Sequence, residues 1–260
     1  MRIVSLTCSN TEIVAALGCG DQLVGVDDYS DYPEELVAKL PRVGPDLGIR
    51  VEDVARLEPD LVLASLTVPG HEKVVESIDK AGLPYIAPAP TGIDDVYRDV
   101  RDIAARLGVV ERGEVVVAEM QAALAPAPVS EDARPKILVE WWPKPVIVPA
   151  GQSWVTDLIE RAGGVNPWGD VDRESVSVEP AEVERVAPDA VVLSWCGIEP
   201  HKVRASVARE RDGWQNVPAI AHDRVVLIPE AYLGRPSPRL IEGCERLRRV
   251  VGQVHAARSQ

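Results

Sequence analysis

The sequence predicts an α/β fold with two Rossmann-like lobes joined by a long backbone helix, with a ligand cleft between the lobes. Three observations predict it. The segment 11–18 recurs as 156–163, and the segment 54–65 recurs in the same order as 183–194. Short apolar runs alternate with helical patterns, which is typical of parallel βα units. A long helical pattern separates the two copies. A cleft between two similar lobes is the default place for a small ligand.

The first lobe is expected over residues 1–92. Thr11 is expected to cap a helix that stops at Gly18, because threonine favours the N-cap and glycine the position after the last turn. Pro59 closes the next helix, since proline cannot continue it. The expected strands are 3–6, 23–26, 61–64 and 85–87, and the expected helices are 11–17, 51–57 and 72–81.

Residues 93–125 are expected to form the connecting helical segment, with weak breaks near Gly108 and Gly113. Its second part joins the lobes, and because a helix is a stiff spacer we expect the lobes to move little relative to each other. The second lobe is expected over residues 126–260. Its expected strands are 137–139, 190–193 and 225–228, and its expected helices are 155–162, 181–186, 200–209 and 238–254.

Composition limits the class of partner. Of the 260 residues 46% are hydrophobic and 27% are charged, which is ordinary for a globular protein. The net charge of −13 argues against nucleic acid and against an anionic membrane surface, and it suits docking on a basic partner. No segment has the length of a transmembrane helix, so the chain is not expected to span a membrane. Met1 leads directly into a strand without a signal-peptide pattern.

No catalytic set is recognisable, so the chain is not expected to be an enzyme. The motifs of serine hydrolases, zinc proteases, P-loop proteins and dinucleotide-binding proteins are all absent from the sequence. No pair of cysteines has metal or redox spacing, so neither a metal site nor an intrinsic cofactor is predicted. The cysteines are expected to be free thiols, mostly buried: Cys8, Cys19, Cys196 and Cys244. The histidines have no helical partner and are expected at the surface: His71, His201, His222 and His255.

The loops that follow the expected strands carry aromatic side chains. They are 27–33 with Tyr29 and Tyr32, 140–143 with Trp142, 194–197 with Trp195, and 230–239 with Tyr232 and Arg235. Ligands of parallel sheets bind outside the carboxyl ends of the strands, so these side chains are expected at one rim. Flat rings with a few polar groups suit a bulky planar ligand. The alternatives are that the tyrosines cap the sheet and that the tryptophans pack in the core.

Three motifs resemble one protein family. Ser-Asp-Tyr-Pro at 30–33, Leu-Glu-Pro-Asp-Leu-Val at 57–62 and Pro-Ser-Pro-Arg at 236–239 resemble the substrate-binding proteins of ABC importers for metal chelates. The resemblance spans nearly the whole chain in the same order. The second motif is common to the wider family and does not select a ligand. The first motif and the aromatic loop before the third are more typical of the vitamin B12-binding branch.

The resemblance implies a corrinoid such as cobalamin in the cleft, an ABC importer permease as partner, and a monomer outside the cytoplasm. Cys8 and Tyr29 would contact the ligand from the first lobe. One glutamate per lobe, Glu72 and Glu199, would dock to permease arginines, although acidic residues are also common at helix starts for electrostatic reasons. The ligand contacts implied from the second lobe are Trp142, Trp195, Tyr232 and Arg235.

Two departures leave the ligand open. Cys8 stands where the family often has proline, and Leu-Thr-Val at 66–68 stands where an aromatic residue is expected. A haem or iron–siderophore receptor of the same fold is therefore an alternative. A cytoplasmic corrinoid-binding protein is the other alternative if Met1 is the native start.

Overall fold

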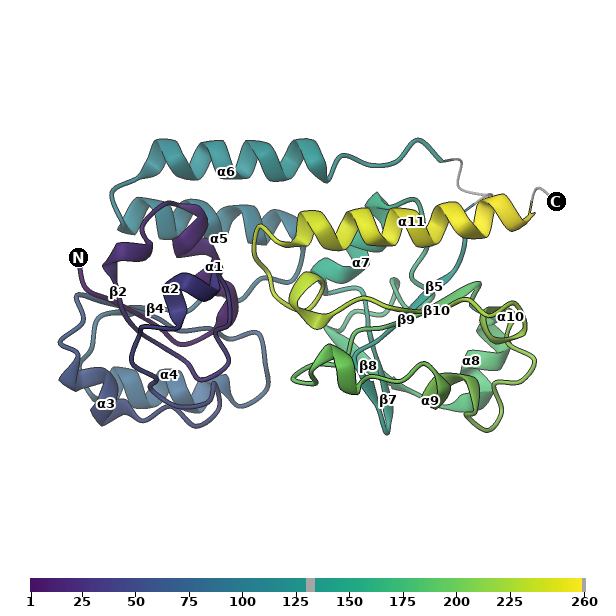
Figure 1. Cartoon of the computed structure of the whole chain (residues 1–260), viewed down its shortest axis with the longest axis horizontal. Helices are drawn as coiled ribbons and strands as arrows, with labels where there is room; N and C mark the ends of the chain where they lie inside the picture. The colour runs from purple at the N-terminus through teal and green to yellow at the C-terminus, as the bar shows by residue number, and fades with distance from the viewer. Residues whose placement is uncertain (130–133, 259–260) are drawn as a thin grey trace. The chain divides into compact units, whose positions relative to one another are not determined.

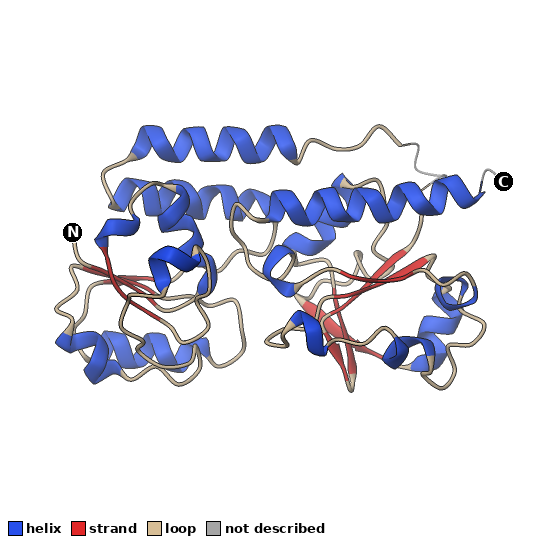
Figure 2. Cartoon of the chain, viewed as in Figure 1, coloured by secondary structure: helices blue, strands red, loops and turns tan. Residues whose placement is uncertain are grey.

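The computed structural model describes residues 1–129 and 134–258. The chain forms two compact units (Figure 1). Unit 1 contains Met1–Pro90 and Asp94–Met120, and unit 2 contains Thr91–Ile93 and Gln121–Gln260. Helices and strands alternate in both units, which confirms the predicted two-lobe α/β fold (Figure 2). The ligand cleft between the lobes stays a prediction. No helix within the described residues is long and apolar enough to cross a membrane.

Unit 1 is built on a parallel four-stranded sheet with the strand order β2-β1-β3-β4. Apolar side chains from β1, β3, α3 and α4 form a buried cluster that includes Val4, Val62, Val54 and Ile78. The strands are β1 Ile3–Ser5, β2 Leu23–Val26, β3 Leu61–Leu63 and β4 Tyr85–Ile86. The helices are α1 Cys8–Ala16, α2 Glu34–Val37, α3 Val51–Arg56, α4 His71–Lys80, α5 Ile93–Arg106 and α6 Val110–Ala123, and Gly20–Gln22 is a 3₁₀ turn, η1.

The predicted start of the first helix is wrong. Helix α1 begins at Cys8, with the extended residue Thr7 at its N-cap. Thr11 lies inside the helix and is fully buried. Its hydroxyl donates to Ser5 Oγ at 2.8 Å and lies 2.8 Å from Ser30 Oγ. Tertiary hydrogen bonds therefore decide the position of Thr11, whereas local capping preference indicated the helix start.

The long helical pattern after residue 92 forms two helices. Helix α5 ends at Arg106, and Gly108 has a left-handed φ of 69° in the turn before α6. Gly113 does not break a helix, because it lies within α6. A Cβ atom at Gly113 would lie 2.5 Å from the Cβ of Ala104, so the missing side chain allows the two helices to pack closely. From Asp94 to Met120 this helical pair belongs to unit 1.

Unit 2 contains two three-stranded sheets. The parallel sheet, of order β10-β9-β5, is formed by β5 Ile137–Glu140, β9 Ala190–Leu193 and β10 Val225–Leu227. The other sheet, of order β6-β7-β8, is antiparallel. Its strands are β6 Trp142–Pro143, β7 Val146–Pro149 and β8 Ser175–Val178. The sequence pattern did not indicate this second sheet, because its strands are short and two of them, β6 and β7, end in proline, which is rare in sheets.

The helices of unit 2 pack around the parallel sheet. Helix α11 packs against α7 and supplies buried Leu247 and Val251. The predicted helix 200–209 is wrong, because that segment forms a 3₁₀ turn and a separate single helical turn. The helices are α7 Trp154–Arg161, α8 Pro180–Val186, α9 Ser206–Arg209, α10 Pro218–Ala221 and α11 Leu240–Arg258, and the 3₁₀ turns are η3 Pro200–Lys202 and η4 Glu230–Tyr232.

Candidate functional site

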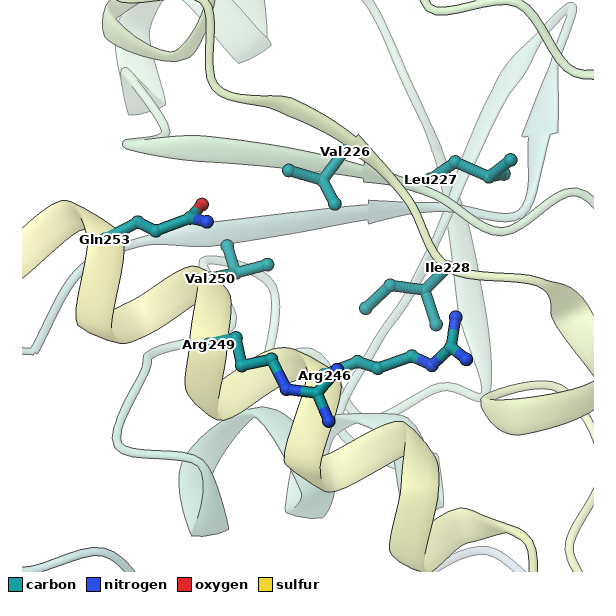
Figure 3. A pocket seen from close by; sticks show the side chains of 7 residues that line it. All are labelled: Val226, Leu227, Ile228, Arg246, Arg249, Val250 and Gln253. Atoms are coloured by element: carbon teal, nitrogen blue, oxygen red, sulfur yellow. The ribbon is translucent and has the colours of Figure 1, made fainter.

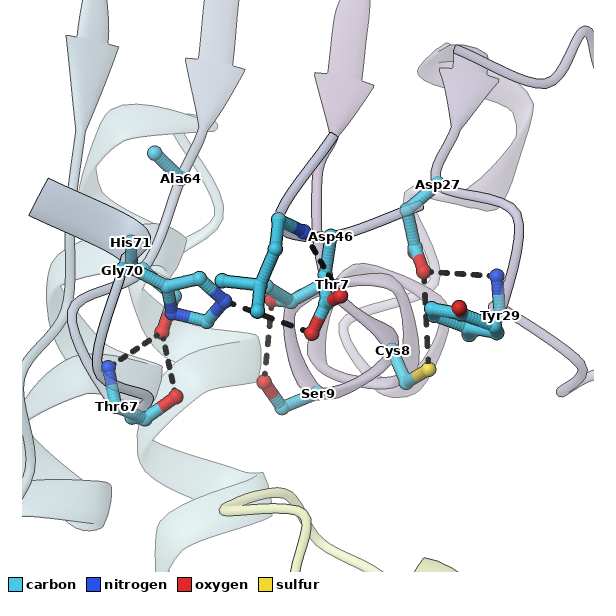
Figure 4. Close-up of polar contacts among 12 residues, drawn as sticks. Thr7, Cys8, Ser9, Asp27, Tyr29, Asp46, Ala64, Thr67, Gly70 and His71 are labelled. Atoms are coloured by element: carbon cyan, nitrogen blue, oxygen red, sulfur yellow. Dashed lines mark hydrogen bonds and ion pairs between the residues drawn. The ribbon is translucent and has the colours of Figure 1, made fainter. Parts of the chain in front are cut away.

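The carboxyl ends of the parallel strands of unit 1 carry a row of polar side chains (Figure 4). Thr7 and Ser9 follow β1, and their hydroxyl oxygens lie 3.3 Å apart. Ser65 and Thr67 follow β3, and their hydroxyl oxygens lie 2.9 Å apart. Ligands bind at this end of parallel sheets in α/β proteins. The structure therefore offers a polar rim where such a site is expected.

Tyr29 projects from a short turn after β2 and is 56% exposed. Its backbone N–H donates to Asp27 Oδ2 at 2.9 Å. The half-buried thiol of Cys8 lies 4.0 Å from the same carboxylate oxygen. The structure thus brings Cys8 and Tyr29, both predicted ligand contacts, to one place around Asp27 (Figure 4). Tyr32, later in the same loop, is also exposed.

His71 contradicts the prediction that the histidines lie at the surface. It is the first residue of α4 and is only 3% exposed. Its Nε2 lies 3.6 Å from Asp46 Oδ2, and this imidazole is the main cause that lowers the pKa of Asp46 (Figure 4). No local pattern predicts this burial, because Asp46 lies in a loop far from α4 along the chain. The pair places the 44–48 loop beside the start of α4.

Glu72 follows His71 and is exposed in the first turn of α4. Its carboxylate accepts a hydrogen bond from the backbone N–H of Gly70 at 2.8 Å. Backbone N–H groups at the helix start lower the pKa of Glu72. The side chain is therefore an anion at the helix N-terminus, which is compatible with docking and with the ordinary acidic preference of helix starts.

Glu199 occupies the corresponding place in unit 2, directly before η3. Its carboxylate is exposed and lies 2.7 Å from Lys202 Nζ and 3.4 Å from His201 Nε2. The hydrogen bond from Lys202 is the main cause that lowers the pKa of Glu199. Glu199 is thus ionised and already has a cation beside it.

The two predicted tryptophans of unit 2 have different surroundings. Trp142 lies in β6, is 40% exposed, and donates from Nε1 to the carbonyl of Lys144 at 3.1 Å. Trp195 is only 7% exposed and belongs to the buried cluster of the unit. Its Nε1 donates to Glu140 Oε1 at 2.9 Å. Of the two, Trp142 has the ring surface that a ligand could cover.

Glu140, the last residue of β5, is a fully buried carboxylate. Arg211 donates to both of its oxygens, from Nη1 at 2.6 Å and from Nη2 at 3.0 Å. The same guanidinium lies 4.2 Å above the ring centroid of Trp214. The backbone N–H of Cys196 donates to the carbonyl of Trp141 at 3.1 Å, so this network also joins the two loops that carry the tryptophans.

Tyr232 and Arg235 lie close together after β10. Tyr232 ends η4, and its ring centroid lies 4.7 Å from the guanidinium carbon of Arg239 and 4.4 Å from that of Arg246. Arg235 donates from Nε to Glu230 Oε2 at 3.2 Å. The contact between Arg246 and the Tyr232 ring therefore joins the 230–239 loop to α11, whereas the Arg239 contact and the ion pair lie within the loop.

A groove of about 220 Å³ lies between β10 and α11 (Figure 3). None of the predicted site residues lines it. Arg246 borders both this groove and the ring of Tyr232. Within the described residues, no group of three histidine, cysteine or acidic side chains could hold a metal ion. The groove is lined by Val226, Leu227, Ile228, Arg246, Arg249, Val250 and Gln253.

Comparison with known proteins identifies the class. A family model for periplasmic binding proteins matches residues 3–232, so the chain belongs to that family. It is 30% identical over 254 residues to YvrC, an uncharacterised ABC transporter substrate-binding lipoprotein of Bacillus subtilis, covering 95% of this chain and 78% of the relative. The chain is thus a substrate-binding protein of the ABC-importer class, as the sequence motifs predict. Proteins of this class serve transporters and are not enzymes.

Further relatives have named ligands. The chain is 25% identical to a vitamin B12-binding protein of Vibrio parahaemolyticus, covering 96% of this chain and 90% of the relative. The structure is similar to the periplasmic heme-binding protein RhuT of Roseiflexus sp. RS-1, with a TM-score of 0.81, 27% identity and 98% of each chain covered. The vitamin B12-binding protein BtuF of Vibrio cholerae shares the fold, with a TM-score of 0.75, 21% identity and 97% of each chain covered.

Proposed function

We propose that this protein binds cobalamin or a related corrinoid and delivers it to the permease of an ABC importer. The observation that carries the proposal is the exposed ring of Tyr29 on a turn held by buried hydrogen bonds. Vitamin B12-binding proteins among the relatives, at 25% identity or slightly more over nearly the whole chain, support it. The proposed ligand contacts are Cys8, Tyr29, Trp142, Tyr232 and Arg235.

The exposure of Tyr29 needs a physical reason. Burying a large apolar side chain stabilises a protein by roughly 1.5–3 kcal/mol, and unit 1 does not gain this at Tyr29. An aromatic ring presented on an ordered turn lowers the entropy cost of binding, because little has to be immobilised when a ligand arrives. Trp142 offers a second exposed ring in unit 2. Flat aromatic surfaces suit a planar macrocycle.

A second candidate ligand is haem, with an iron–siderophore as a third. The observation that favours haem is the group of arginines on the 230–239 loop and α11: Arg239 and Arg246 over the Tyr232 ring, and Arg235 beside Glu230. Guanidinium groups bind carboxylates well, so this group would suit a ligand that bears carboxylates. The similarity to a heme-binding protein at 27% identity points the same way. A cytoplasmic corrinoid-binding protein remains the alternative that involves no permease.

The test is a parallel titration with cyanocobalamin, hemin and ferrichrome, followed by calorimetry and by the melting temperature. We expect one-to-one binding of cyanocobalamin and a rise in melting temperature by mass action. Tyr29→Ala should weaken binding by roughly 2 kcal/mol, or about 30-fold, without lowering the melting temperature of the free protein. Val115→Ala, which also trims an exposed apolar side chain of unit 1, is the matched control and should change neither value.

The outcomes separate the candidates. Stabilisation by hemin or ferrichrome but not by cyanocobalamin would overturn the corrinoid assignment and keep the receptor class. Full affinity in Tyr29→Ala would show that the exposed ring is not a ligand contact.

A further inference from the structure

Asp27 is a carboxylate in an unusual place. It follows the last residue of β2, and its side chain is 0% exposed. Burying a carboxylate is costly unless hydrogen bonds satisfy it. Oδ2 accepts the backbone N–H of Tyr29, and Oδ1 accepts the hydroxyl of Ser30 (Figure 4 shows the contact with Tyr29). Both of these donors belong to the turn that presents Tyr29, and the thiol of Cys8 in α1 lies 4.0 Å from Oδ2, so the carboxylate fixes the conformation of that turn from inside.

A row of hydroxyl groups connects the 27–30 turn to the core of unit 1. Ser30 Oγ lies 2.8 Å from Thr11 Oγ1, and Thr11 Oγ1 donates to Ser5 Oγ at 2.8 Å. All three side chains are buried. Ser5 ends β1 and Thr11 lies inside α1. The turn is therefore connected to a central strand and to a helix through the hydroxyl groups of Ser30 and Thr11.

Arg42 holds the same turn from the other side. Its Nη1 donates to the carbonyl of Asp27 at 2.8 Å and to the carbonyl of Ser30 at 2.6 Å. The two carbonyls flank Tyr29 in the sequence. With the side chain of Asp27 and the guanidinium of Arg42 both engaged, the backbone on each side of Tyr29 has a defined position, while the ring itself remains exposed.

We propose that Asp27 is a positioning residue for ligand binding: its buried carboxylate holds the 27–30 turn so that the Tyr29 ring is presented in a binding-ready orientation. The inference rests on the proposed function, since it requires Tyr29 to contact the ligand. Asp27 does not itself touch the ligand, because it is fully buried. Because the turn is already ordered, less conformational entropy is lost when the ligand binds.

Asp27→Asn is the direct test, because the amide keeps the shape and one acceptor oxygen but replaces the other by a donor. One of the two bonds to the turn is then lost. We expect the dissociation constant for cyanocobalamin to rise about tenfold, within the usual range for coupled neighbours. In the Tyr29→Ala background the same substitution should have little further effect, because the ring through which Asp27 acts is gone and only the 4.0 Å contact with Cys8 remains.

Hydrogen exchange tests the same inference without ligand, beside the binding measurements on the single and double variants of Asp27 and Tyr29. Hydrogen exchange of peptides covering residues 27–33 should become faster in Asp27→Asn than in the parent protein. Ser30→Ala, which removes the hydroxyl donor and leaves the carboxylate, should behave in the same direction and serves if Asp27→Asn does not fold. Val54→Ala is the control for simple destabilisation: Val54 is buried in α3, so its truncation should lower the melting temperature but leave the dissociation constant unchanged.

The outcomes distinguish this inference from the proposed function. If Tyr29→Ala binds normally, the proposed contact fails. If Tyr29→Ala binds weakly but Asp27→Asn and Ser30→Ala bind normally, or if the effects of Asp27 and Tyr29 simply add, the positioning role is wrong. If hydrogen exchange over residues 27–33 is unchanged in both Asp27→Asn and Ser30→Ala, the positioning role is wrong. This holds whether the protein binds cyanocobalamin, hemin or ferrichrome.

Discussion

Each unit contains a fully buried carboxylate at the carboxyl end of a parallel strand, and the two are satisfied differently. Asp27 in unit 1 accepts hydrogen bonds from Tyr29 and Ser30, two and three residues further along the chain. Glu140 in unit 2 accepts from Trp195 and Arg211, which are 55 and 71 residues away. The local arrangement shapes a turn and leaves its aromatic ring exposed. The long-range arrangement joins loops and buries its ring.

The difference shows how an aromatic residue after a strand should be interpreted. Tyr29 and Trp195 both follow strands of parallel sheets, and the family resemblance implies a ligand contact for each. Only Tyr29 exposes its ring, whereas Trp195 packs in the core and donates to Glu140. Position after a strand therefore does not determine whether a ring is exposed: the indole of Trp195 donates to buried Glu140, whereas Tyr29 donates to Asp27 through its backbone N–H.

Of the substitutions that test the two carboxylates, removal of the Arg211 side chain should lower the free energy of unfolding most. Arg211→Ala leaves Glu140 buried without its cation, which typically destabilises a protein by about 3–5 kcal/mol. Urea unfolding would measure the loss. Arg209→Ala is the control, because it breaks an exposed pair with Asp223 and should cost at most about 1 kcal/mol. Similar stabilities of the two variants would mean that Glu140 does not depend on Arg211.

Another buried carboxylate, Asp99 in α5, extends the comparison because burial raises its pKa to about 7. A group whose pKa is higher in the folded state loses stability as the pH rises from the unfolded to the folded pKa. Its contribution should fall between about pH 4 and pH 7, by up to roughly 1.4 kcal/mol per pH unit, and then level off. Asp99→Asn should flatten the stability profile in that window, measured by urea unfolding against pH. A difference between variant and parent that does not vary with pH would contradict this.

Trp195→Phe should lower the stability of the protein by less than Arg211→Ala and should leave ligand binding nearly unchanged. The substitution removes the N–H that donates to Glu140, and hydrogen bonds to charged groups contribute about 1.5–3 kcal/mol. We expect a lower melting temperature and a dissociation constant for cyanocobalamin within about twofold of the parent value. Trp142→Phe, which loses a bond to an exposed carbonyl, is the matched control for stability. A large loss of affinity in Trp195→Phe would make Trp195 a ligand contact after all.

Substitution of Glu72 and Glu199, the two glutamates predicted to dock to a permease, should have the smallest effect on the stability and ligand affinity of the protein. Glu72→Arg with Glu199→Arg should leave ligand affinity unchanged and abolish ligand-dependent stimulation of the permease ATPase, because charge complementarity orients the complex. The single variants would show whether Glu199, which already has Lys202 beside it, contributes less than Glu72. Glu76→Arg, another exposed position in α4, is the control. Full stimulation by the double variant would remove the docking proposal.

Periodic features could be predicted from the sequence. The repeat, the β1, β3 and β9 strands and the helices α3, α4 and α7 all follow from apolar spacing and from Gly and Pro boundaries, which are local signals. The antiparallel sheet was missed because Pro143 and Pro149 obscure strand spacing. At the site, the motif indicated Tyr29 but not the burial of His71 or Trp195. Burial depends on partners such as Asp46 and Arg211, which lie far away along the chain.

The division of the chain between the units has a consequence for biosynthesis. Every residue of unit 1 lies within the first 120 residues, so this unit can fold while the rest of the chain is still on the ribosome. Unit 2 differs, because its last helix packs against α7, and Arg248 in that helix donates to the carbonyls of Ala123 and Ala125. Its core closes only when α11 has left the exit tunnel. Nascent chains should therefore acquire a protease-resistant fragment of unit 1 first, and unit 2 should become resistant only once α11 has emerged from the ribosome.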